Sequence, residues 1–165
     1  MNKVLKIATV LTWINMIFWG MICLFALLIV LGSGSPALLI FLVFPSAIFL
    51  HSYAAFQLQK TIRYPVIPLS KQTPTGIRFI GFVALFVGIS LLANGIGFIQ
   101  DPKEFLSLLQ SQWPQELKDS HPLKITQVRA MGIFFLVMGL CVAVNVNLNF
   151  RLLRWYYFIR NNSEK

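Results

Sequence analysis

The chain has 165 residues, of which 57% are hydrophobic and only 12% are charged, and its formal net charge is +9. A soluble globular domain carries about 25% charged residues, so the composition excludes this class and indicates a protein that lies mostly within a membrane. The basic residues are not gathered in a compact domain, so we predict no nucleic-acid partner.

Four long apolar runs predict four transmembrane helices, at residues 7–31, 37–56, 79–99 and 130–150. Each run has roughly the 20 residues that a helix needs to cross a hydrocarbon core of about 30 Å. The first connection, residues 32–36, is so short that the helices beside it are expected to form an antiparallel hairpin. We therefore predict an all-α membrane protein, a four-transmembrane-helix antiparallel bundle that forms a single domain over residues 1–165.

The connection between the second and third runs, residues 57–76, contains Pro65, Pro68 and Pro74 and no acidic residue. The residue before a proline is restricted to extended backbone, so this connection is expected to be stiff. Because its Lys and Arg side chains attract anionic headgroups, we interpret it as a basic strap on the inner membrane surface.

The connection between the third and fourth runs predicts a short amphipathic helix at residues 102–113. Asp101 is suited to the N-cap, Pro102 to the first helical position and Glu104 to the capping box. The apolar residues of this segment fall on one helix face: Phe105, Leu108, Leu109 and Trp113. An amphipathic helix that ends in Trp is expected to lie flat at the outer membrane interface.

The C-terminal segment, residues 151–165, combines aromatic and basic side chains. Four aromatic residues at 155–158 lie among Arg151, Arg154 and Arg160. Such residues anchor helix ends at the level of the lipid headgroups. We predict that this basic aromatic tail extends the fourth helix beyond the membrane on the cytoplasmic side.

The distribution of basic residues predicts the orientation of the helices. If the N-terminus lies inside, ten basic residues fall in inner segments: Lys3, Lys6, Lys60, Arg63, Lys71, Arg78, Arg151, Arg154, Arg160 and Lys165. Four fall in outer segments: Lys103, Lys118, Lys124 and Arg129. Cytoplasmic loops carry the excess of Lys and Arg, so we predict an integral plasma (inner) membrane protein with both termini in the cytoplasm. In size and topology the chain resembles the small four-span proteins of bacterial inner membranes.

The third and fourth runs share the pattern G-x-x-x-L-x-x-G at an offset of 51 residues. The shared positions are Gly81, Leu85 and Gly88 in one run and Gly132, Leu136 and Gly139 in the other. Seven residues return a helix almost to the same face, and glycine lets two helix backbones approach closely in lipid. The pattern predicts a helix-packing contact. An inverted repeat around a transport site is the alternative interpretation.

Polar residues of three predicted helices lie at one depth in the inner half of the membrane. Counted at 1.5 Å per residue, Asn15 lies about 12 Å, His51 about 9 Å and Asn145 about 8 Å from the inner boundary. Asn149 follows Asn145 by one helical turn, on the same face. Two interpretations stay open: hydrogen bonds that hold helices together, or a small polar pocket that opens to the cytoplasm.

The functional hypotheses follow from what the predicted spans contain. No Asp, Glu, Lys or Arg lies well inside a span, and Cys23 and Cys141 have no metal-ligand spacing, so we predict no catalytic residue, metal ion or cofactor. The leading hypothesis is a non-enzymatic accessory, assembly or regulatory subunit that acts through helix–helix contacts. Its partners would be the lipid bilayer and another membrane protein or a second copy of itself. One alternative is an oligomeric channel or carrier for an uncharged or lipid-like solute, and a remote alternative is a membrane enzyme.

Overall fold

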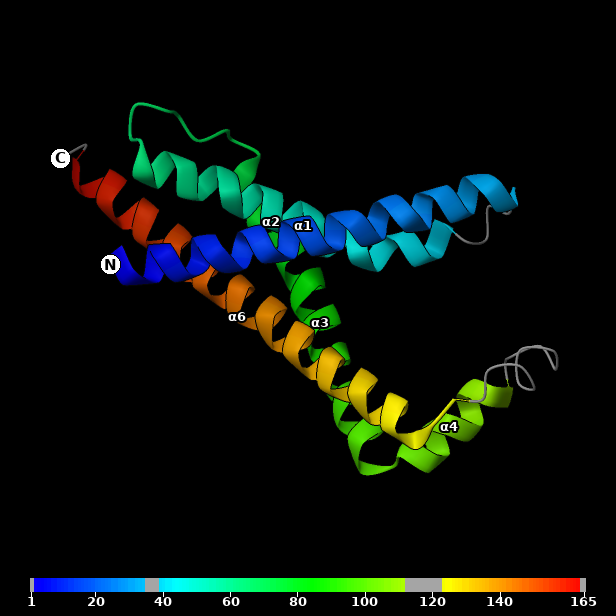
Figure 1. Ribbon diagram of the computed structural model, residues 1–165. Helices are drawn as coiled ribbons and strands as arrows, with labels where there is room; N and C mark the ends of the chain where they lie inside the picture. The colour runs from blue at the N-terminus through cyan, green and yellow to red at the C-terminus, as the bar shows by residue number, and fades with distance from the viewer. Residues whose placement is uncertain (1, 35–38, 112–122, 164–165) are drawn as a thin grey trace. The chain divides into compact units, whose positions relative to one another are not determined.

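The computed structural model describes residues 2–34, 39–111 and 123–163 (Figure 1). Over these residues the chain folds into helices, and they contain no β-strand. The helices are α1 (Asn2–Ser33), α2 (Ile40–Arg63), α3 (Thr73–Gln100), α4 (Pro102–Ser111) and α6 (Ile125–Ser163). The prediction of an all-helical protein is confirmed for the described part of the chain.

Three helices are long and apolar enough to cross a membrane, over Lys3–Ser33, Thr73–Gln100 and Ile125–Arg160. They contain the first, third and fourth predicted spans. The membrane class predicted from composition is therefore supported by helices of suitable length as well as by hydropathy. Helix α2 contains the second predicted span from Ile40 onward.

The connection between α2 and α3 is shorter than the predicted strap of residues 57–76, which is a correction. Helix α2 continues to Arg63, and α3 begins at Thr73, so only residues 64–72 connect them. Tyr64 precedes Pro65 and leaves the helical region, with φ −126° and ψ 86°, as the residue before a proline is expected to do. Pro74 lies in the first turn of α3, where a missing N–H removes no helical hydrogen bond.

Contacts between residues divide the chain into two compact units, residues 1–87 with 141–165 and residues 88–140. In the first unit, α1 and α2 lie along each other (Figure 1). Its apolar core takes side chains from four helices: Ala8 of α1, Leu58 of α2, Ile77 of α3, and Leu152 and Leu153 of α6. Helix α6 runs to Ser163, so the basic aromatic tail continues the fourth helix as predicted, up to the last described residue.

The second unit contains the end of α3, α4 and the first part of α6. Helix α4 begins at Pro102, the predicted first position. The ring of Phe105 meets Phe98 of α3 edge-on, with ring centroids 4.4 Å apart, so α4 folds back onto the helix that precedes it. Its predicted end at residue 113, with Trp113 on the apolar face, lies outside the described residues.

Candidate functional site

Four polar side chains meet inside the first unit, and we refer to them as the polar layer: Thr12, Gln59, Asn145 and Asn149. Thr12 comes from α1, Gln59 from α2, and both asparagines from α6. Each is at most 2% exposed. Burial of a polar group is costly unless it is hydrogen-bonded, so the contacts among these groups decide whether the layer stabilises the fold.

The hydrogen bonds of the polar layer connect all three helices. Gln59 Nε2 donates to Thr12 Oγ1 at 2.9 Å and to Asn149 Oδ1 at 2.8 Å. Thr12 Oγ1 donates to Asn145 Oδ1 at 2.8 Å. Asn149 Nδ2 donates to Asn145 Oδ1 at 2.9 Å and to the Asn145 carbonyl oxygen at 2.8 Å. The side-chain amide of Gln59 on α2 donates to residues of both α1 and α6, so it links these two helices through hydrogen bonds.

Asn15 lies one turn further along α1 and bonds to backbone. Its Nδ2 donates to the Leu11 carbonyl oxygen at 2.9 Å and to the Cys141 carbonyl oxygen of α6 at 3.4 Å. Its Oδ1 has no hydrogen-bond partner among the described residues. Asn15 therefore fastens α1 to α6 through the backbone and keeps an unused acceptor.

His51 is fully buried but does not join the polar layer. Its ring meets the ring of Phe150 edge-on, with centroids 6.3 Å apart and an interplanar angle of 85°. The backbone of Ile77 lies nearby, yet neither ring nitrogen has a described partner at hydrogen-bond geometry. His51 is thus packed as an aromatic ring between α2, α3 and α6.

Four residues were singled out in the sequence. Asn145 and Asn149 hydrogen-bond to each other in the polar layer, whereas Asn15 bonds to backbone carbonyls and His51 packs against Phe150. Thr12 and Gln59 were missed. The sequence carries a signal for each, because Thr12 precedes Asn15 by three residues and Gln59 follows Ser52 by two helical turns. A search along helix faces would have found Thr12, and it would have found Gln59 once the second helix was extended beyond residue 56.

The polar layer and its surroundings retain unused hydrogen-bonding capacity. The unpartnered atoms among the described residues are Asn15 Oδ1, Trp19 Nε1, His51 Nδ1 and Nε2, Ser52 Oγ and Gln59 Oε1. Leaving a buried polar group unsatisfied costs about 1–3 kcal/mol. All these groups are uncharged hydrogen-bonding groups or an imidazole, so the chemistry they offer is donation and acceptance of hydrogen bonds. Within the described ranges, no group of three or more His, Cys, Asp or Glu could hold a metal ion.

A glycine seam joins α3 and α6 in the second unit, and it is formed by Gly88, Gly95, Gly132 and Gly139. A methyl carbon at Gly139 would lie 2.8 Å from the carbonyl oxygen of Gly88, and one at Gly95 would lie 2.8 Å from that of Gly132. Both backbones thus approach as closely as glycine permits. The neighbouring leucines also correspond: Gly139 faces Leu92, and Gly95 faces Leu136.

The seam uses a different copy of the sequence pattern from the one aligned at an offset of 51 residues. G-x-x-x-L-x-x-G occurs twice on α3, at 81–88 and again at 88–95, and the second copy faces residues 132–139. Gly88, Gly132, Leu136 and Gly139 therefore belong to the seam. Gly81 belongs to the first unit, where it lies against Phe150 and His51, and Leu85 is half-buried in the same unit. Comparison with models of protein families, with curated proteins and with solved structures gives no match to this chain.

Proposed function

We propose that the chain is a four-span integral membrane protein that works without catalysis, as an accessory, assembly or regulatory subunit that acts through helix–helix contacts. Three spans rest on helices of suitable length and hydropathy. For α2, the polar residues His51, Ser52 and Gln59 are buried, whereas exposed positions include Val43, Phe44 and Leu50. Its 24 residues give a length of about 36 Å at 1.5 Å per residue, enough to cross a hydrocarbon core.

The proposed topology places both termini in the cytoplasm and makes α1 and α2 an antiparallel hairpin. The excess of basic residues at the inner ends of the helices supports this orientation. Helix α4 then lies at the outer interface, where Glu104 and Lys103 are exposed and Phe105 packs on α3. The plasma (inner) membrane is the proposed location.

The observation that carries the functional proposal is the inward placement of the polar groups. Thr12 and Asn15 of α1 are fully buried, and each bonds to α6. Between Ile7 and Leu31 the exposed positions of α1 are instead apolar, and they include Ile7, Val10, Trp13, Ile14, Ile17, Met21, Leu24, Phe25, Leu28 and Leu31. A partner within the bilayer therefore meets an apolar helix surface, and its contact with this protein is a packing contact between helices.

Site-specific photo-crosslinking in intact membranes tests this proposal. A photoreactive residue is placed at Ile17 or Phe25 of α1, which are 57% and 59% exposed, and for comparison at Ile133 of α6, which is also 57% exposed. We expect a protein adduct of constant mass from one of the two helices and lipid adducts from the other. If all three positions gave the same kind of adduct, the proposal of a partner protein bound to one defined helix surface would be contradicted.

The unpartnered buried atoms favour a second candidate, an oligomeric channel or carrier for a small uncharged solute. His51 near the polar layer and Gln59 within it keep polar atoms that have no hydrogen-bond partner among the described residues. Such atoms suit a solute that donates and accepts hydrogen bonds. Native mass spectrometry after mild extraction distinguishes the candidates, because a symmetric homo-oligomer with solute flux in liposomes supports the second. A monomer that co-purifies with a crosslinked partner supports the first.

A further inference from the structure

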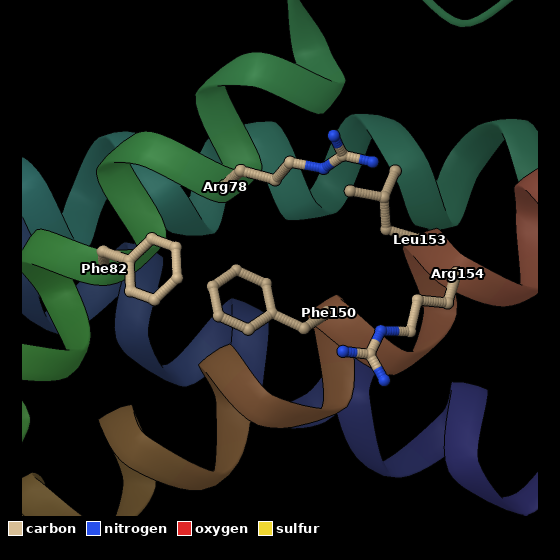
Figure 2. Close-up of a pocket in the computed structure, with 5 residues that line it drawn as sticks. All are labelled: Arg78, Phe82, Phe150, Leu153 and Arg154. Carbon is tan, nitrogen blue, oxygen red and sulfur yellow. The ribbon is translucent and has the colours of Figure 1, made fainter.

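A cavity of about 320 Å³ lies between α3 and α6 in the first unit. Arg78 and Phe82 of α3 and Phe150, Leu153 and Arg154 of α6 line it (Figure 2). In Figure 2 the two arginine side chains extend along opposite sides of this space, and the Phe82 and Phe150 rings lie together at one end. Its volume is at the lower end of the roughly 300–1,000 Å³ typical of ligand sites.

The cavity brings together two positive charges that have no acidic counterpart among the described residues of their own unit. Arg78 and Arg154 are both exposed. The described residues of the first unit contain no Asp or Glu, so none of them supplies a carboxylate to either guanidinium. The Arg78 guanidinium carbon lies 5.8 Å from the centroid of the Tyr157 ring. This cation–π contact orients the side chain and leaves its N–H groups free to bind an anion.

The other walls of the cavity are apolar. The centroids of the Phe82 and Phe150 rings are 5.6 Å apart, and the Phe82 side chain is 67% exposed, so this ring pair continues onto the outer surface. Leu153, which is 2% exposed, closes the cavity towards the core. One end of the site is therefore cationic, and the other leads to an exposed aromatic surface.

We propose that this cavity binds the phosphate group of an anionic phospholipid. Arginine presents several N–H donors in a planar fork that matches phosphate oxygens. The aromatic pair provides the surface along which the first part of an acyl chain would pack. The shared chemistry is a phosphate anion, and a lipid is the source because α3 and α6 are helices of membrane-spanning length. On the proposed topology both arginines lie at the cytoplasmic boundary, where basic residues attract anionic headgroups.

Native mass spectrometry of the purified full-length chain in mild detergent tests this site. The protein is titrated with phosphatidylglycerol and, separately, with phosphatidylcholine of the same acyl chains. We expect one tightly bound phosphatidylglycerol, with phosphatidylcholine at least tenfold weaker. Arg78→Gln and Arg154→Gln should each weaken phosphatidylglycerol binding about fivefold, which corresponds to about 1 kcal/mol per basic residue. The lysine variants R78K and R154K keep the positive charge, so their affinity for phosphatidylglycerol should fall less than that of the glutamine variants.

Arg129→Gln is the matched control, because it removes the same charge from an exposed residue of α6 in the second unit. We expect it to leave phosphatidylglycerol binding unchanged. If Arg129→Gln lost as much affinity for phosphatidylglycerol as the cavity variants, net charge alone would attract the lipid, and the proposed binding site would be wrong. Equal binding of the two lipids would also overturn it. If millimolar inorganic phosphate displaced bound phosphatidylglycerol, the cavity would be a site for free phosphate, and the proposal of a lipid ligand would be wrong.

Folding controls and one further variant complete the test. Circular dichroism and gel filtration verify that each arginine variant is folded, as we expect for exposed side chains. Phe82→Ala should weaken phosphatidylglycerol binding without changing the affinity for inorganic phosphate, and an unchanged lipid affinity would contradict the role of the ring pair. Because no partner protein enters these measurements, lipid binding is decided independently of the proposed accessory role.

Discussion

A single methyl group at Gly139 should separate α3 from α6. In Gly139→Ala the new carbon would lie 2.8 Å from the carbonyl oxygen of Gly88 and 3.0 Å from the backbone nitrogen of Leu92. Ordinary contacts of a Cβ atom begin near 3.4 Å, so the helices must move apart locally by about 0.6 Å. The obstructing atoms include backbone atoms, which cannot turn away as the end of a flexible side chain can.

The cost of this separation exceeds the gain from replacing glycine. Overpacking typically costs about 1–3 kcal/mol, while Gly to Ala in a helix contributes up to about 1 kcal/mol in the opposite direction. We expect a net loss of about 1–2 kcal/mol in the free energy of unfolding. Titration with SDS in mixed micelles, followed by tryptophan fluorescence, measures this quantity.

Gly76→Ala supplies the matched control on α3. A methyl group there would find its nearest neighbour, the Ala54 Cβ atom, at 3.9 Å, an ordinary contact. This variant should therefore be as stable as the parent or slightly more stable. The double variant with Gly95→Ala and Gly139→Ala should lose less free energy of unfolding than the two single variants together, because both methyl groups require the same helix separation. Equal stability of Gly76→Ala and Gly139→Ala would refute the close contact.

Three further predictions concern the polar layer and the topology. Gln59→Leu should lower the free energy of unfolding by about 1–2 kcal/mol in the same SDS titration, because Thr12 Oγ1 and Asn149 Oδ1 both lose a donor. The control variant Gln57→Leu, at a half-buried position, should change this free energy little. His51→Leu should change that free energy by less than about 1 kcal/mol, since no described hydrogen bond is lost; a larger loss would indicate a bound water or solute at the imidazole. With the native cysteines replaced, a cysteine at Ser33 should react with a membrane-impermeant reagent added outside intact cells, and one at Gln72 should not; the opposite pattern would reverse the topology.

The helices were predictable because their signals are local. Apolar runs of spanning length located α1, α3 and α6, and Pro102 located the start of α4. Pro74 misled the prediction of the connector, because proline both interrupts a helix and suits its first turn. Only the surrounding chain distinguishes these two uses.

The contacts between helices were harder to predict because they depend on register. The glycine pattern on α3 has two overlapping copies, and nothing within one helix specifies which copy meets α6. Gln59 was missed for a related reason: it lies beyond the predicted end of its span at residue 56, yet α2 continues and turns it inward. Side chains at a helix end are assigned correctly only when the helix end is known.

The heptad spacing of the α3 glycines means that a displaced register of this helix would offer α6 the same small residues. Displacement of α3 by seven residues, about 10.5 Å along its axis, would bring Gly81 and Gly88 to the positions that Gly88 and Gly95 now occupy, with glycine pairs again in contact with α6. Two registers would then satisfy the same small-residue contact. In the native register Gly81 is covered by the rings of Phe150 and His51. In the displaced register Pro74 would take the place of Gly81, and its side-chain carbons would collide with these two rings, so the rings favour the native register.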